Sequence, residues 1–248
     1  MEAAQIIRDA IARVSSLRRD CEEDADLAAS VFAVKAFQAR RFAGTYADLL
    51  ADDKYRDAAQ FFLVELYSDK DYTDRDAQFG RIAGGLQKLF TKQVVATAVS
   101  LAQLHVLTEE LDHAMASAWL ASGASPDDSP ALRYAQAWRV VGHRDRRNRQ
   151  LATVQQIGVD LARLTRLPGL RLVLRMMRKP AHAAGLGSLQ QFLESGFDTF
   201  ASMAHHASGV ETFLSIINER ESELIDLLFD GSPVACATKL SAILGQAR

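Results

Sequence analysis

Apolar residues recur at steps of three and four along almost the whole chain, and this periodicity limits the fold more than any other feature. In the first segment the apolar stripe comprises Ala3, Ile6, Ile7, Ala10, Ile11, Val14 and Leu17. Such steps place residues on one face of an α-helix, and residues 26–50 continue the pattern. No run of alternating β-branched residues flanked by turn dipeptides is found. The sequence therefore predicts an all-α protein.

Proline and capping residues indicate where the helices begin and end. Ser129-Pro130 and Ser232-Pro233 each pair an N-cap serine with a proline at the first helical position. Thr91 is placed to cap a helix that runs to about residue 121. Residues 1–43 lack glycine and proline, so the first two helices are either long or joined by a tight bend. We predict a multi-helix bundle of about nine to eleven helices with long N-terminal helices.

The composition favours a globular, intracellular protein. Hydrophobic residues make up 48% and charged residues 24%, which argues against disorder. The N-terminus has no signal-peptide pattern, and the longest stretch without charge, between Lys92 and Glu109, is short and polar for a membrane span. Cys21 and Cys236 form no CxxC pair, which fits a reducing cytoplasm. We expect one domain, 1–248, with a soft subdivision near 123–130.

Charge is distributed unevenly along the chain. Residues 139–179 hold eleven basic residues and two acidic ones, a local charge of +9 in a chain whose net charge is −2. Within this segment Arg171, Arg175 and Arg178 share a helix face, and Arg144 and Arg147 join them if the two helices pack side by side. Such a face can bind an anionic ligand or an acidic protein. The alternative is internal neutralisation by the acidic remainder. A pI near 6.3 makes nucleic acid an unlikely partner.

Histidines supply the candidate metal and haem ligands. Glu110 and His113 are spaced as in half of a di-iron motif, and His105 lies about two turns earlier. A second Glu-x-x-His is absent from the sequence, so an ordinary polar helix face is the alternative. His205 and His206 could bind haem or complement the negative end of a helix. No cofactor is required by the sequence, but haem or iron remains an alternative.

Two further segments suggest a calcium loop and a phosphate loop, but each is better explained by a structural role. The first, residues 68–76 (SDKDYTDRD), lacks the aspartate spacing of a calcium-binding loop. We expect Thr73 and Asp76 to form a capping box instead. We also expect Arg75 to pair with acidic residues under the helix that carries Phe61 and Phe62. Gly80, Gly84 and Gly85 lack the spacing of a phosphate loop and are expected to permit close helix packing.

Several stretches resemble an uncharacterised family of proteobacterial helical proteins. They are FFLVELYSDKDYTDRD at 61–76, LAQLHVLTEELDHAMA at 101–116, and AGLGSLQQFLESGFDTFASM at 184–203. The first contains an FFLxxLYxxxDxxxRD-like motif. The resemblance implies a bacterial cytoplasmic protein and supplies no site residues.

Two classes of function stay open. One is a non-catalytic binding or regulatory protein that uses the arginine-rich face or a pocket between helices. The other is a haem- or iron-dependent helical enzyme or carrier of ferritin-like, haem-oxygenase-like or globin-like kind. Self-association, as a homodimer or larger homo-oligomer, is also expected, because long amphipathic N-terminal helices often dock on a symmetry mate.

Overall fold

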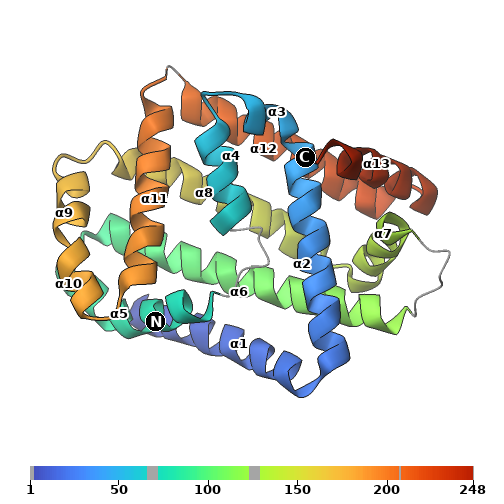
Figure 1. Ribbon diagram of the computed structural model, residues 1–248, viewed down its shortest axis with the longest axis horizontal. Helices are drawn as coiled ribbons and strands as arrows, with labels where there is room; N and C mark the ends of the chain where they lie inside the picture. Colours follow the sequence, from blue (N-terminus) through green and yellow to red (C-terminus); the bar gives the residue numbers. More distant parts are fainter. Residues whose placement is uncertain (1–2, 66–71, 123–128, 207, 248) are drawn as a thin grey trace.

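The computed structural model describes residues 3–65, 72–122, 129–206 and 208–247, and every regular element within these ranges is an α-helix (Figure 1). The all-α prediction is confirmed. Thirteen helices lie in the described part of the chain, and eleven of them have at least seven residues. They are α1 (Ala3–Glu23), α2 (Ala25–Thr45), α3 (Ala47–Ala51), α4 (Arg56–Glu65), α5 (Thr73–Leu89), α6 (Lys92–Ala121), α7 (Pro130–Val141), α8 (Arg144–Leu164), α9 (Leu170–Met176), α10 (Arg178–Ala183), α11 (Gly187–Ala204), α12 (Gly209–Asp230) and α13 (Pro233–Gln246).

Local capping accounts for several helix starts, as predicted. The hydroxyl oxygens of Ser129 and Ser232 each accept a hydrogen bond of 3.1 Å from a backbone N–H of the first turn, and Thr91 caps α6 in the same way. The first two helices are joined by a tight bend. Asp24 makes that bend: its carboxylate accepts the backbone N–H groups of Asp26 and Leu27, both at 3.0 Å.

Helix α6 is the longest of the described helices and contacts α1, α2, α5, α7 and α8. Figure 1 shows α1 running beside α6, and α1 also contacts α5. Helices α2, α7 and α8 pack on α6, and α12 packs on α8. Helices α7 and α13 lie at one end of the molecule, while α9 and α10 lie at the opposite end beside α11 (Figure 1).

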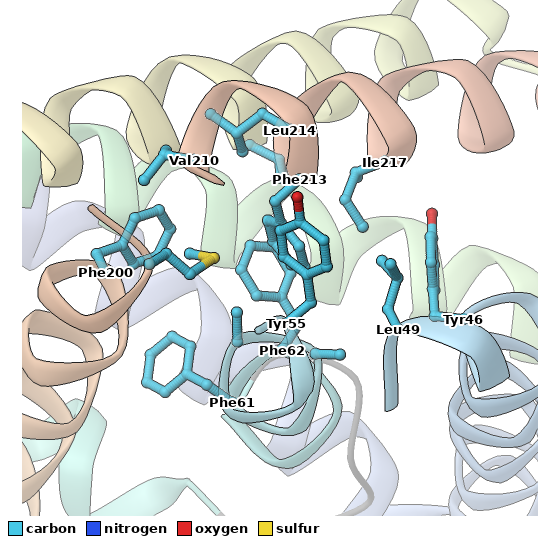
Figure 2. Packing of buried hydrophobic residues seen from close by; sticks show 14 of the residues in the cluster. Tyr46, Leu49, Tyr55, Phe61, Phe62, Phe200, Val210, Phe213, Leu214 and Ile217 are labelled. Atoms are coloured by element: carbon cyan, nitrogen blue, oxygen red, sulfur yellow. The ribbon is translucent and has the colours of Figure 1, made fainter. Parts of the chain in front are cut away.

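An aromatic cluster joins α4 to α11 and α12. Phe62 of α4 meets Phe213 of α12 edge to face, with ring centroids 5.4 Å apart, and Tyr55 stacks on the same Phe213 (Figure 2). Phe61 lies on the side of α4 that faces α11, near Phe200 (Figure 2). Such contacts add to the free energy gained from area burial alone. This cluster fixes α4 against α11, and α11 in turn lines one side of an internal cavity.

The apolar stripe of α1 is buried within the chain itself. Ile7 and Val14 are fully buried, and the cluster around Ile7 includes residues of α5 and α6. Most of the stripe is therefore covered by neighbouring helices of the same chain, while Ala3 and Ile6 are partly buried. Self-association stays a prediction without support from this stripe.

Two local expectations differ from the structure. Thr73 and Asp76 form no capping box: α5 begins at Thr73 without a side-chain cap, and Asp76 points inward. Gly80 and Gly84 do not mark a backbone approach that requires glycine, since a Cβ there would meet its nearest neighbour at 3.7 Å. The close approach is at Gly44, where a Cβ would lie 2.0 Å from the carbonyl oxygen of Ile243.

Residues 123–128, which make up most of the proposed subdivision, lie outside the described residues, and Ser129 and Pro130 begin α7. Across the described helices, none combines the length and the apolar character that crossing a membrane requires.

Candidate functional site

An elongated cavity of about 420 Å³ lies between α5, α6, α8 and α11. One face of α6 forms its floor, with lining residues at steps of three and four from Val94 to Asp112. The eighteen residue steps from Val94 to Asp112 rise by about 27 Å, so the cavity follows α6 for most of its length. Volumes of this size are typical of small-molecule sites.

Apolar side chains line most of the cavity. They come mainly from α5, α6, α8 and α11, and include Phe79, Ile82, Leu86, Phe90, Ala98, Leu101, Leu161, Leu164, Leu189, Phe192, Leu193 and Phe197. At one end the wall is made by α9, α10 and the adjoining turns, through Leu170, Leu174, Met177, Ala181 and Leu186. An apolar lining of this extent favours a ligand with a long apolar portion.

The other end of the cavity is polar and closely hydrogen-bonded. Lys35 donates to both carboxylate oxygens of Glu109, at 2.8 and 2.9 Å, and Gln38 donates to Asp112 at 3.0 Å. Burial raises the pKa of Asp112, and Lys35 opposes this only in part. Burial alone would lower the pKa of Lys35, but the charges of Glu109 and Asp112 outweigh it and the pKa is raised. Gln150 donates to Thr108 at 2.7 Å beside this group.

A second polar cluster surrounds Asp76, midway along the cavity. Its Oδ2 accepts hydrogen bonds from Arg18 at 2.6 Å and from Nε2 of His105 at 2.8 Å. The Asp76 side chain is only 4% exposed. Burial would raise its pKa, but the bonds from His105 and Arg18 prevail, so the pKa of Asp76 is lowered.

Arg75 joins this cluster to the aromatic wall of the cavity. Its guanidinium lies over the rings of Tyr72, at 3.9 Å, and Phe192, at 4.7 Å, which is cation–π geometry. It also reaches Glu65 of α4 at 3.5 Å, so the predicted pairing under the Phe61–Phe62 helix is confirmed. Arg75 of α5 therefore links this helix to α4 and α11.

The five candidate anion-binding arginines lie in two separate groups. Arg144 and Arg147 stand at the start of α8, where Arg144 reaches Asp230 at 2.6 Å and the buried Arg147 lies over the Trp138 ring. Arg171, Arg175 and Arg178 follow the far end of α8, about 30 Å away for a helix of 21 residues. The structure does not bring the two groups onto one face.

The three arginines of α9 and α10 differ in their partners. Arg171 pairs with Asp198 at 2.9 Å, and Arg178 holds Glu194 with bonds of 2.6 and 2.8 Å. The side chain of Arg175 is exposed and makes no salt bridge with a described residue. The anion-binding hypothesis for these three stays a prediction.

The candidate metal and haem residues are dispersed. Glu110 pairs with Arg13, at 3.1 Å, and with Arg146, while His113 lies 3.9 Å from Asp20. His105 is bonded to Asp76, and His205 and His206 are exposed just after α11. Among the residues that the structure describes, no group of three or more His, Cys, Asp or Glu side chains is close enough to hold a metal ion.

The cavity itself was missed from the sequence, although α6 carries a signal for it. Thr97, His105, Thr108, Glu109 and Asp112 recur at helical steps on one face of an otherwise apolar helix. Polar residues repeated on a face that should be buried mark a polar cavity or network.

Comparison with known proteins places the chain in a family. Residues 17–235 match the family described as Domain of unknown function (DUF8198). The chain belongs to this family. No curated protein and no solved structure is detectably similar to it. The DUF8198 match covers most of the chain and agrees with the resemblance to an uncharacterised family, and it assigns no activity to the cavity.

Proposed function

We propose that the chain is a non-catalytic binding protein whose cavity holds an elongated amphipathic small molecule. The cavity along α6 carries this proposal: it is apolar over most of its length and polar at one end. A ligand with an apolar chain and one polar end group matches that division, because each part then meets lining of its own kind.

The polar groups of the cavity support binding more than catalysis. Lys35 is held by Glu109, and His105 is held by Asp76, so each of these basic groups already has a strong partner. A general base or nucleophile must be within reach of its substrate with its reactive atom available. Here Nζ of Lys35 and Nε2 of His105 are bonded to carboxylates and stabilise the fold around the cavity.

The charges of the lining indicate an uncharged end group. At the polar end one basic residue, Lys35, lies with two acidic ones, Glu109 and Asp112, and the whole lining has three lysine and arginine residues against four acidic ones. An anionic head group would therefore meet no excess of positive charge. We expect a monoacylglycerol or a long-chain alcohol to bind more tightly than the fatty acid of equal length.

A cavity-filling substitution tests the proposal. Ala98 lines the cavity, whereas Ala96, two residues earlier on the same helix, is exposed. Ala98→Phe should weaken the binding of an uncharged fluorescent probe such as N-phenyl-1-naphthylamine by about tenfold or more, equivalent to ~1.4 kcal/mol. Ala96→Phe, the same substitution on the opposite face, should leave probe binding unchanged.

Displacement and mass spectrometry complete the experiment. Monoacylglycerol should displace the probe, and native mass spectrometry of the wild type should show an apolar molecule that Ala98→Phe does not retain. Failure of the wild type to bind the probe, or equal losses in both variants, would refute a ligand site along α6.

A further inference from the structure

The segment that closes the apolar end of the cavity has an unusual outer surface. Residues 161–186 contain six arginine and lysine residues and no acidic residue. The segment comprises the last turn of α8 followed by α9, α10 and their turns, and α9 and α10 lie at one extremity of the molecule (Figure 1). Its outward-facing residues form the α9–α10 surface, which consists of Arg166, Leu167, Arg171, Leu172, Val173, Arg175, Met176, Arg178 and Lys179, all of them exposed or at the limit of exposure.

Helix α9 has apolar residues on two sides. Leu170 and Leu174 line the cavity, whereas Leu172 and Met176 point outward and are each 60% exposed. A surface helix of a water-soluble protein normally has one apolar stripe, and that stripe faces the core. The packing of this chain therefore leaves the greater part of Leu172 and of Met176 uncovered.

Positive charge surrounds these outer apolar residues. The α9–α10 surface has five basic residues, and two acidic partners, Asp198 and Glu194, neutralise two of them. Arg166, Arg175 and Lys179 make no salt bridge with any described residue. An excess of three positive charges is left beside Leu172 and Met176. Arg166, Arg171 and Arg175 also line an open crevice of about 590 Å³ between α9 and α11.

We propose that the α9–α10 surface docks on an anionic phospholipid membrane. Helix α9 would lie in the plane of the interface, with Leu172 and Met176 among the acyl chains and the basic side chains at the lipid phosphates. Amphipathic helices bind membranes through this combination of apolar burial and attraction to anionic lipid. Arginine and lysine suit the rim, because their apolar stems can lie along the acyl region while their charges reach the phosphates.

Other occupants fit this surface less well. A second copy docked by a two-fold axis would set the same unpaired arginines against each other. A nucleic acid would match the charge but would leave Leu172 and Met176 against phosphates and sugars. A membrane satisfies both the charge and the exposed apolar side chains, and the cavity behind α9 is itself lined for an apolar molecule.

The proposal goes beyond the binding of a ligand in the cavity and does not depend on it. Docking would place the apolar end of the cavity against a source of lipid. The two ideas are nevertheless tested by different residues, since Leu172 and Met176 do not line the cavity and Ala98 is not part of the α9–α10 surface.

Co-sedimentation with vesicles tests the docking. The full chain should bind vesicles of phosphatidylcholine mixed with phosphatidylglycerol more tightly than vesicles of phosphatidylcholine alone, and added salt should weaken the binding. The double variant Leu172→Gln/Met176→Gln should lose binding. The matched control is Phe32→Gln/Val140→Gln, which changes residues 59% and 76% exposed on other helices and should bind as the wild type does.

A second pair of variants isolates the charges. Arg166→Gln/Arg175→Gln should weaken binding about 25-fold, which is about fivefold or ~1 kcal/mol for each basic residue removed. Arg40→Gln/Arg149→Gln removes two exposed arginines elsewhere and should have little effect. Ala98→Phe should bind vesicles normally, and Leu172→Gln/Met176→Gln should bind the fluorescent probe normally. Failure of the docking proposal is thereby distinguished from failure of the cavity proposal.

Three results would overturn the proposal. The first is no binding of the wild type to the phosphatidylglycerol vesicles. The second is an equal loss in the control variants. The third is binding to double-stranded DNA or polyglutamate that depends on Arg166 and Arg175 but not on Leu172 and Met176, because the surface would then serve a nucleic acid or an acidic protein.

Discussion

Removing the charge of Asp76 should destabilise the chain, because this carboxylate joins three helices. Its Oδ2 accepts hydrogen bonds from Arg18 of α1 and His105 of α6, and Asp76 itself belongs to α5. Asp76→Asn keeps the shape of the side chain and removes its charge. The amide oxygen can still accept a bond, but the amide nitrogen then faces the Nε of Arg75, which lies 3.6 Å from the present Oδ1.

The size of the loss follows from the two hydrogen bonds. A hydrogen bond to a charged group contributes about 1.5–3 kcal/mol, and a neutral one about 1 kcal/mol. Arg18 is 24% exposed and can partly recover its hydration. We therefore expect the free energy of unfolding to fall by about 3 kcal/mol at pH 7, and the melting temperature by about 6–12 °C for a chain of this length.

The pH dependence gives the prediction a second test. Since the folded pKa of Asp76 is lowered below its ordinary value of 3.8, its contribution is fully present above that value and is lost as the pH falls through the folded pKa. Urea unfolding of wild type and variant should thus show a difference in the free energy of unfolding that is present at pH 5 and shrinks below about pH 4. The control, Asp53→Asn, alters a carboxylate that is 92% exposed, and its effect should be below about 1 kcal/mol. A loss at Asp76 no greater than that at Asp53 would refute this account.

Two other predictions use matched substitutions. Asp112→Asn should leave the chain at least as stable as the wild type at pH 7, because burial raises the pKa of Asp112 and its ionised form is therefore costly. As the pH falls, the urea midpoint of the wild type should rise relative to that of the variant. A large loss of stability in the variant at pH 7 would contradict this. Gly44→Ala should lower the free energy of unfolding by about 2–3 kcal/mol, because a Cβ would collide with the carbonyl oxygen of Ile243. Gly80→Ala, whose Cβ would have its nearest contact at 3.7 Å, should raise the free energy of unfolding by about 0.5–1 kcal/mol. Thermal melts in which both variants change in the same direction would contradict the packing argument.

The parts of the fold that could be predicted depend on residues close together in sequence. Ser129 and Ser232 cap the backbone three residues ahead of them, and the helix starts follow from that local bond. The 3.6-residue period likewise needs only one helix at a time. The bend at Asp24 was left open, since four acidic residues occur at 22–26 and any of the aspartates among them could serve as a cap.

The site could not be predicted because its contacts join residues far apart in the sequence. Asp76 looks like a capping residue beside Thr73, but Arg18 is 58 positions away and His105 is 29 positions away, and these two decide its environment. Glu110 was a candidate metal ligand on the spacing of His113 alone. In the fold it pairs with Arg13 and Arg146, which come from α1 and α8.

The basic segment combines the two alternatives that its composition left open. In its first part the arginines are used within the fold: Arg144 reaches Asp230 and Arg146 reaches Glu110, as expected of internal neutralisation. In its last part the nearby acids are fewer than the bases, so that Arg166, Arg175 and Lys179 are left without salt-bridge partners in the described structure. Neutralisation alone would not place exposed Leu172 and Met176 beside the unpaired charges. The charge asymmetry of the chain therefore has two parts, and the proposed membrane docking concerns only the part at α9 and α10.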